Sequence, residues 1–202
     1  MNKSAEKSEQ RQVSPQETEK IIHLANKILL LRVEGDFVEL GCYKGETSVL
    51  LQKLLVSKPI PERTLYLYDS FAGLPEKSSE DASSAGAAFK AGELYVSKRE
   101  VIDRFRRANL PLPVIKKAFF SDLALKDLPE KIAFAFLDGD LYSSIVDSLR
   151  LVVPRLVRKG IIVVHDYNNP ELPGVSRAVD EFLKTSPDFS LKNQFSLAIL
   201  EH

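Results

Sequence analysis

The chain has 202 residues, of which 44% are hydrophobic and 28% are charged, and its 28 basic and 28 acidic residues leave a formal net charge of zero. The length suits one domain with a substantial core, and the lack of excess positive charge argues against a nucleic-acid or anionic-membrane partner. No stretch approaches the roughly 20 apolar residues that span a bilayer. A polar N-terminus without an apolar signal core, together with the single cysteine Cys42, predicts a cytoplasmic protein without an intramolecular disulfide.

Capping signals and hydrophobic spacing divide the chain into alternating helices and strands. Residues 1–13 are polar and are expected to form a flexible tail, followed by a single domain over 14–202. Ser14-Pro15-Gln16-Glu17 supplies an N-cap, a proline at N1 and a capping-box acid. From there the pattern predicts helices over 15–32, 46–56, 97–108, 143–156 and 175–185, strands over 37–40, 63–68, 114–117, 132–137 and 161–164, and a closing antiparallel pair at 189–191 and 196–200.

This alternation predicts an α/β fold with a mostly parallel sheet and helices on both faces. The irregular stretch 70–96 is rich in Ser, Ala and Gly. A loop of this length in a compact domain is usually a lid, a binding loop or a disordered segment. Because it leaves the sheet at the edge where ligands bind, we expect it to be a lid or substrate loop.

Two apolar runs end abruptly in carboxylates: IAFAFLDGDLY over 132–142 and IIVVHDY over 161–167. Runs of this kind are typical of strands buried on both faces, and ligands in parallel sheets bind beyond the carboxyl ends of the strands. Asp138, Asp140 and Asp166 are therefore expected to meet at one edge, where oxygen ligands suit Mg²⁺ or Mn²⁺. Alternatively, Asp140 is only the N-cap of the helix that begins near Leu141.

His165 precedes Asp166, and neighbouring strand residues face opposite sides of a sheet. If the strand continues through this position, His165 points away from the site and is structural. If the strand has ended, His165 is available as a metal ligand or a base.

The segment from Glu39 to Ser48 joins the first strand to its helix. Gly41 and Gly45 allow close approach of the backbone to a ligand, and the free N–H groups of the helix suit an anion such as a carboxylate. The spacing is not the G-x-G-x-x-G fingerprint, and an acid at position 39 suits an ammonium group. The alternative is a tight turn with a solvated glutamate.

Asp69 ends the second strand, where an acid can accept hydrogen bonds from ribose hydroxyls. It could instead cap a turn, since Asp-Ser is common turn chemistry. Tyr43 and Phe71 could flank an adenine, although isolated aromatic residues more often serve packing.

Taken together, four segments resemble the macrocin O-methyltransferase (TylF-like) family: GDFVELGCYKGETS (35–48), LYDSFAGLP (67–75), IAFAFLDGDLYSSIVDSL (132–149) and IIVVHDYNNPELPGVSRAVDEF (161–182). The resemblance runs from about Gly35 to Leu183. It implies a Rossmann-like class I methyltransferase fold, with a mostly parallel seven-stranded sheet whose last strand is antiparallel, and S-adenosylmethionine as the cofactor.

The resemblance also implies roles for individual residues. Glu39, Gly41 and Gly45 would line the methionine part of the cofactor, with Tyr43 and Ser48 in the same segment. Asp69 would hold the ribose with Ser70 and Phe71 beside it, and Ser121 and Asp122 would border the adenine. Asp138 would lie at the cofactor site and bind Mg²⁺, and Asp140 is the suggested general base. The family has a consecutive Asp-Asp pair as further Mg²⁺ ligands, which corresponds here to His165 and Asp166.

The expected function is therefore a metal-assisted, S-adenosylmethionine-dependent O-methyltransferase, with Asp138, Asp166 and His165 as candidate metal ligands and Asp140 as base. Its expected partner is a small-molecule acceptor, a sugar in the known family members, and a homodimer is a further expectation. One alternative is a metal-independent methyltransferase that uses His165 or Asp140 as base. Another is a non-catalytic module that only binds the cofactor. A nicotinamide-dependent dehydrogenase is disfavoured because the G-x-G-x-x-G fingerprint is missing.

Overall fold

The structure is a computed structural model that describes residues 12–57, 63–83 and 88–201. Most of the predicted flexible tail over 1–13 lies outside these residues. At the tail's end the prediction is wrong, because Val13 is only 6% exposed and belongs to the hydrophobic core. Packed residues therefore precede the first helix.

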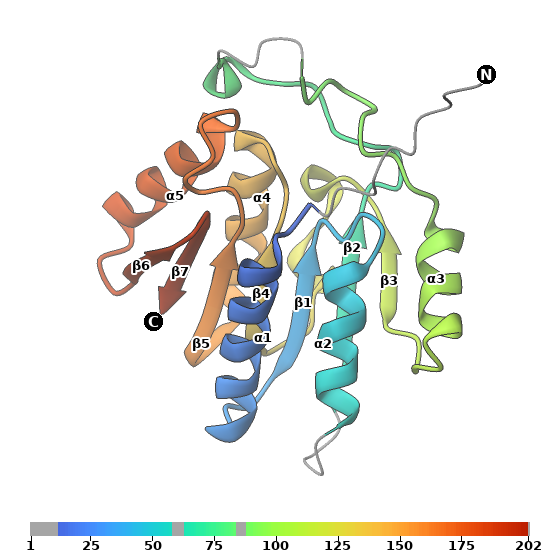
Figure 1. The fold of residues 1–202 in the computed structure, drawn as a ribbon. Coiled ribbons are helices and arrows are strands. Elements are labelled where there is room, and N and C mark those ends of the chain that lie inside the picture. Colours follow the sequence, from blue (N-terminus) through green and yellow to red (C-terminus); the bar gives the residue numbers. More distant parts are fainter. Residues whose placement is uncertain (1–11, 58–62, 84–87, 202) are drawn as a thin grey trace, which may run out of the picture.

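Seven strands form one sheet in the order β3-β2-β1-β4-β5-β7-β6. The pairs within β1 to β5 are parallel, and β7 runs antiparallel to both of its neighbours (Figure 1). This confirms the predicted mostly parallel sheet with a closing antiparallel pair. The strands are β1 (Asp36–Leu40), β2 (Leu65–Asp69), β3 (Val114–Lys117), β4 (Ile132–Leu137), β5 (Leu156–Val164), β6 (Ser190–Gln194) and β7 (Leu197–Glu201).

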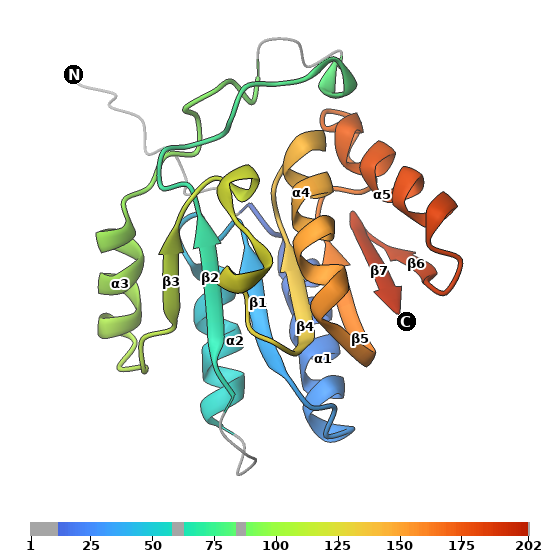
Figure 2. The ribbon, with the colours of Figure 1, turned by 180° about the vertical axis from the view of Figure 1, so that it is seen from behind.

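Helices cover both faces of the sheet, as predicted. The main helices are α1 (Pro15–Leu30), α2 (Glu46–Val56), α3 (Lys98–Arg107), α4 (Tyr142–Val152) and α5 (Pro173–Thr185). Side chains of α1, α2 and α3 join one core cluster with the sheet, and those of α4 and α5 join a second cluster. The two views show α1 and α2 in front of the sheet in Figure 1 and α4 in front of it in Figure 2. Alternate residues of β4 therefore serve both clusters, which explains why that strand is apolar at every position.

None of the helices in the described part of the chain is long and apolar enough to cross a membrane.

Several element ends differ from the prediction for local reasons. α1 has the predicted capping box, with Ser14 accepting a hydrogen bond from the Glu17 backbone N–H, but it ends at Leu30. α4 also ends earlier than predicted, at Val152, where the chain tightens into a 3₁₀ turn that contains Pro154 because proline cannot donate a helical hydrogen bond. β5 begins at Leu156, five residues earlier than predicted.

Residues 70–83 and 88–96, here called the strap, lie between β2 and α3, and residues 70–83 lead from β2 over the carboxyl ends of the strands toward α4 and α5 (Figure 1). Its two ends are joined by backbone hydrogen bonds from Leu74 N to Glu93 O and from Gly92 N to Leu74 O, both 2.9 Å. In its middle Asp81, 1% exposed, accepts a hydrogen bond of 2.7 Å from the Tyr142 backbone N–H. The strap is therefore tied to the first turn of α4.

β1 and β4 approach each other most closely just beyond their ends. Gly41 has a φ of +91°, and a Cβ at this position would lie 1.9 Å from the carbonyl oxygen of Asp138. Only glycine fits there, and the contact brings the loop after β1 against the first acid after β4.

This close approach predicts a stability difference between two glycine variants. Gly92 also has a positive φ, +82°, but nothing lies within 4 Å of an added Cβ. We expect Gly92→Ala to cost about 1 kcal/mol from backbone strain and Gly41→Ala to cost a further 1–3 kcal/mol from the steric clash. Thermal unfolding of both variants measures the difference. Equal unfolding temperatures for the two variants would contradict the close contact.

Candidate active site

The predicted acids do meet at one edge of the sheet, which we call the carboxyl rim. β4 ends at Leu137 and β5 ends at Val164, so Asp138 and the His165-Asp166 pair directly follow adjacent strands. The backbone N–H of His165 still donates to the Leu137 carbonyl, at 2.9 Å, although the strand has ended. The sequence leaves two alternatives for His165, a ring that points away from the site and a ring that lies at it. In the structure the His165 ring lies at the carboxyl rim.

The His165 ring is surrounded by carboxylates. Its Nδ1 lies 2.8 Å from Asp138 Oδ1 and 3.0 Å from Asp166 Oδ2. Its Nε2 lies 3.6 Å from Oε2 of Glu17, on α1. The His165 side chain is 4% exposed, so three acids share one buried imidazole. The sequence indicated Glu17 only as a capping-box residue, and nothing local to it signals this contact.

The charges around His165 shift its pKa and that of Glu17 in opposite directions. Burial by itself would lower the pKa of His165, but Asp138, Asp166 and Glu17 outweigh it and raise the pKa well above its ordinary value. The contact with His165 is the main cause that lowers the pKa of Glu17, against the opposing effect of burial. These shifts favour the protonated form of His165, which makes it a poor candidate base.

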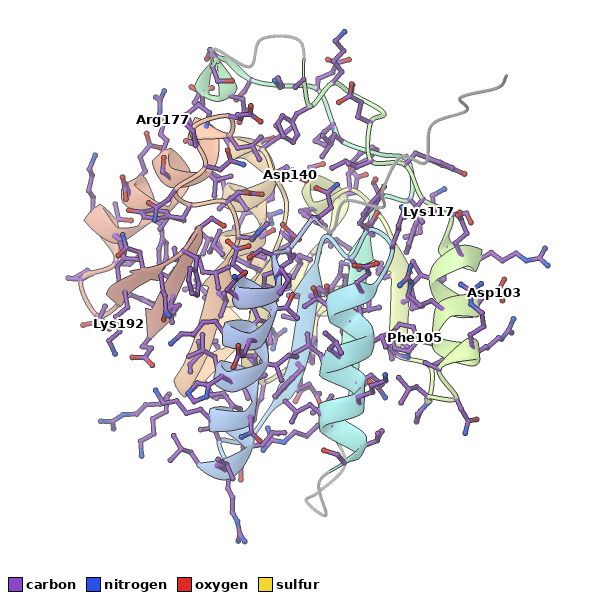
Figure 3. All side chains as sticks on the ribbon, in the orientation of Figure 1. Asp103, Phe105, Lys117, Asp140, Arg177 and Lys192 are labelled. Atoms are coloured by element: carbon purple, nitrogen blue, oxygen red, sulfur yellow. The ribbon has the colours of Figure 1, made fainter. Side chains whose placement is uncertain are left out.

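Asp140 lies at the rim rather than at the end of a helix. The N-cap of α4 is Leu141 with no side-chain cap, and the acid that accepts from the first turn is Asp81 of the strap. The alternative in which Asp140 is only a cap is therefore wrong. Burial, followed by the charges of Asp138 and Asp166, raises the pKa of Asp140 well above its usual range. Figure 3 shows Asp140 below the strap and close to the start of α4.

Asp138, His165 and Asp166 have the geometry of a cation site. One ligand atom from each lies within 4.8 Å of the others. In an octahedron with metal–ligand distances of about 2.1 Å, adjacent ligands are about 3 Å apart and opposite ligands about 4.2 Å. The spacings of 2.8 and 3.0 Å around Nδ1 match the adjacent positions. The residues therefore fit a divalent cation, held by two carboxylates and one imidazole nitrogen in its neutral form.

A cavity of about 290 Å³, here called the loop pocket, lies around the segment after β1. Its lining includes Glu39, Tyr43, Thr47, Arg104 and Asp138. Glu39 is 1% exposed, and its Oε2 has no hydrogen-bond partner among the described residues. Burial, together with Asp138 and Asp69, raises the pKa of this carboxyl well above its usual range, although the Ser48 hydroxyl lowers it in part. The solvated-glutamate alternative is wrong, because Glu39 is buried.

The turn at the start of α2 also faces this region. Gly45 is the N-cap of α2 in a left-handed conformation, and no side chain caps the helix. The Ser48 side chain lies buried on the first turn, where its hydroxyl is close enough to affect the Glu39 carboxyl. A buried acid and an uncapped helix N-terminus together suit a zwitterion.

A second cavity, here called the rim pocket, has a volume of about 80 Å³ and shares Gln12, Tyr43 and Asp138 with the loop pocket. Its lining also includes predicted residues, namely Gly41, Asp69, Ser70, Asp140 and His165, and others that the sequence did not single out, namely Gly73, Leu74, Leu94, Phe119 and Phe120. Phe119 and Phe120 precede the predicted adenine neighbours Ser121 and Asp122, which are exposed and line neither pocket. Phe71 is only 3% exposed and packs in the core.

Asp69 connects the ends of two strands. Its Oδ2 accepts hydrogen bonds of 3.0 Å from the backbone N–H groups of Cys42 and Tyr43, and its Oδ1 accepts one of 2.8 Å from Phe71. Asp69 therefore fixes the loop after β1 against the end of β2. Its Oδ1 retains a free acceptor position toward the rim pocket.

The strand order and the antiparallel β7 are those of a class I methyltransferase fold. Over residues 13–187 the chain matches the macrocin-O-methyltransferase (TylF) family, and it belongs to that family.

Two bacterial enzymes and one solved structure illustrate this similarity. The chain is 30% identical over 155 residues to demethyldecarbamoylnovobiocin O-methyltransferase of Streptomyces niveus, which covers 74% of this chain and 58% of the relative. It is 30% identical over 141 residues to 8-demethyl-8-(2,3-dimethoxy-alpha-L-rhamnosyl)-tetracenomycin-C 4'-O-methyltransferase of Streptomyces olivaceus, with coverage of 67% and 54%. The chain thus spans just over half the length of these relatives. The structure of the O-methyltransferase NovP superposes with a TM-score of 0.79 at 26% identity, over 92% of this chain and 78% of NovP.

The burial of Glu39 predicts a pH-dependent stability difference. An acid whose pKa is raised by folding contributes its full stabilisation below its unfolded pKa, 4.5, and loses it gradually as the pH rises toward the folded pKa. Above that pH, unfolding releases a proton, so stability falls by up to about 1.4 kcal/mol per pH unit. We expect the unfolding free energy of Glu39→Gln, relative to wild type, to rise with pH between 5 and 7. Chemical denaturation at several pH values measures this slope.

The exposed Glu19 of α1 offers a matched control. Glu19→Gln should show no comparable pH-dependent gain. Parallel curves for wild type and Glu39→Gln would show that Glu39 is ionised in the folded protein.

Proposed function

We propose that this protein is an S-adenosylmethionine-dependent O-methyltransferase that acts on a hydroxyl group of a sugar or glycosylated small molecule, assisted by a divalent cation at the carboxyl rim. The observation that carries the proposal is that Asp138 lines both pockets and also contacts His165. The methionine end of a cofactor, in the loop pocket, and an acceptor hydroxyl at the rim would meet at this residue. Membership of the TylF family and the names of the relatives support the chemistry.

The loop pocket suits the methionine part of the cofactor. A buried carboxyl at Glu39 would accept hydrogen bonds from an ammonium group, and the uncapped start of α2 would face a carboxylate. Asp69 would use its remaining Oδ1 acceptor position for a ribose hydroxyl. Phe119 and Phe120, at the far side of the rim pocket, offer apolar surfaces for an adenine.

Methyl transfer to a sugar hydroxyl needs a positioned oxygen and a proton acceptor. A divalent cation at Asp138, Asp166 and His165, when bound, would lower the pKa of the acceptor hydroxyl. Asp140 lies at the same rim and would take the proton, which contributes on the order of 10²–10⁴-fold. Burial and the charges of Asp138 and Asp166 raise the pKa of Asp140, and a cation beside these acids would favour its ionised, proton-accepting form. The strap above would exclude water and hold the acceptor in place.

The cofactor assignment predicts selective binding. Isothermal titration of the purified protein should show binding of S-adenosylmethionine or S-adenosylhomocysteine and no binding of NAD. Glu39→Gln should weaken this binding by about tenfold or more, because a bound ammonium group would favour the ionised form of Glu39 and glutamine cannot supply that charge. Absence of S-adenosylmethionine binding by the wild type would reject the proposed function.

The role of the rim predicts dependence on its acids and on a cation. Methyl transfer to a panel of glycosylated acceptors, followed by mass spectrometry, should fall by at least about 100-fold in Asp138→Ala and Asp166→Ala. EDTA should abolish the activity of the wild type, and added Mg²⁺ or Mn²⁺ should restore it. The exposed Asp188 serves as the control position, since Asp188→Ala should leave the rate unchanged.

Full activity in EDTA combined with loss of activity in Asp140→Asn would instead select the metal-independent mechanism. If cofactor binds but no acceptor in the panel is methylated by any preparation, the result favours a cofactor-binding module.

A further inference from the structure

Glu17 is a buried acid that comes from outside the sheet and yet contacts the rim. It lies in the first turn of α1, is 7% exposed, and places Oε2 at 3.6 Å from Nε2 of His165. The opposite ring nitrogen of His165 faces Asp138 and Asp166. The imidazole therefore lies between Glu17 on one side and the candidate cation ligands on the other.

The Glu17 carboxylate is itself held in place from two directions. Its Oε2 accepts a hydrogen bond of 2.9 Å from the backbone N–H of Ser14, which closes the capping box. Its Oε1 accepts hydrogen bonds from the backbone N–H and the hydroxyl of Ser196, in the turn between β6 and β7. These contacts fix the carboxylate before any ligand arrives, and His165 has little freedom to rotate away from it.

The position of Glu17 determines which nitrogen of His165 faces the rim. Carboxylates are only acceptors, so each ring nitrogen favours a proton toward the acid beside it, Nδ1 toward Asp138 and Nε2 toward Glu17. A cation between Asp138 and Asp166 would replace the proton on Nδ1, and Nε2 would keep its proton toward Glu17. Histidine ligands of metals commonly donate their other ring N–H to a carboxylate, which fixes the ring and increases its basicity.

We propose that Glu17 is a positioning residue that holds the His165 ring with Nδ1 toward Asp138 and Asp166, and thereby sets the affinity of the carboxyl rim for a divalent cation. This inference rests on the proposed function, because it assigns His165 to the cation site. In this arrangement Glu17 orients the ring, and His165 binds the cation. Removal of Glu17 would leave the ring free to turn and its Nε2–H without a partner.

The test is a titration with Mn²⁺ alone, in the absence of cofactor and acceptor, followed by electron paramagnetic resonance. Glu17→Gln is nearly isosteric and keeps the backbone hydrogen bond from Glu17 to the Ser14 side chain. We expect it to weaken Mn²⁺ binding by about 10- to 100-fold. Ser196→Ala is the matched control, because it removes one contact of Glu17 but none of His165, and it should change the Mn²⁺ affinity less than threefold.

A second comparison tests whether Glu17 acts through His165. In a His165→Asp background, an acid at position 17 would face another acid. Adding Glu17→Gln to that background should therefore leave Mn²⁺ affinity unchanged or increase it. If Glu17→Gln fails to fold, Glu17→Asp replaces it, since the shorter side chain keeps the charge but withdraws it from Nε2 and should also weaken binding.

Equal Mn²⁺ affinities of wild type and Glu17→Gln would overturn the inference, as would the same loss in both backgrounds or a wild type that binds no Mn²⁺. Titration of the same samples with S-adenosylmethionine separates these results from failure of the methyltransferase proposal. A Glu17→Gln protein with wild-type cofactor affinity and weakened Mn²⁺ binding would support the positioning role. If cofactor and Mn²⁺ binding weaken equally, Glu17 is structural and the inference fails.

Discussion

Parallel strands that end side by side bring the residues after them to one edge, and in this protein several of those residues are acids. Asp69, Asp138 and Asp166 each lie at or just beyond the end of a strand, and Asp140 follows two residues after Asp138. Their mutual repulsion must be offset if the fold is to be stable. Asp69 is stabilised by three backbone N–H groups, whereas Asp138 and Asp166 share the His165 ring. Backbone N–H groups thus offset the negative charge of Asp69, and the imidazole offsets that of Asp138 and Asp166.

Stabilisation by backbone N–H groups and stabilisation by an imidazole have different consequences. Backbone N–H groups are permanent donors, so the three backbone hydrogen bonds of Asp69 persist whether or not a ligand is bound. The imidazole can serve as a cation by itself or, when neutral, as a ligand of another cation. The same three side chains can therefore form a compact ion cluster without metal and a coordination site with it. Glu17 fits both states, because an Nε2–H faces it in each.

The sheet and the location of the rim could be predicted from the sequence because they depend on local patterns. Buried strands are apolar throughout, and the acids that end them are obvious at Asp138 and Asp166. The extra length of β5 was hidden by the exposed Arg158 and Lys159, which interrupt the apolar pattern, and Lys159 also has a left-handed φ of +68° within the strand. The cap of α4 was misassigned because the acid that accepts its first N–H, Asp81, is 61 residues away in sequence. Glu17 reaches His165 across 148 positions, and only the folded chain brings the two together.

Asp81 joins the strap to the first turn of α4. Its carboxylate accepts the N–H of Tyr142 at the start of α4 and also two hydrogen bonds from Ser78, so it belongs to both the helix and the strap. Loss of the contact with Tyr142 would remove the cap of α4, at a cost of about 1 kcal/mol. Since α4 begins two residues after Asp140, the carboxylate of Asp81 also supports the backbone beside that acid.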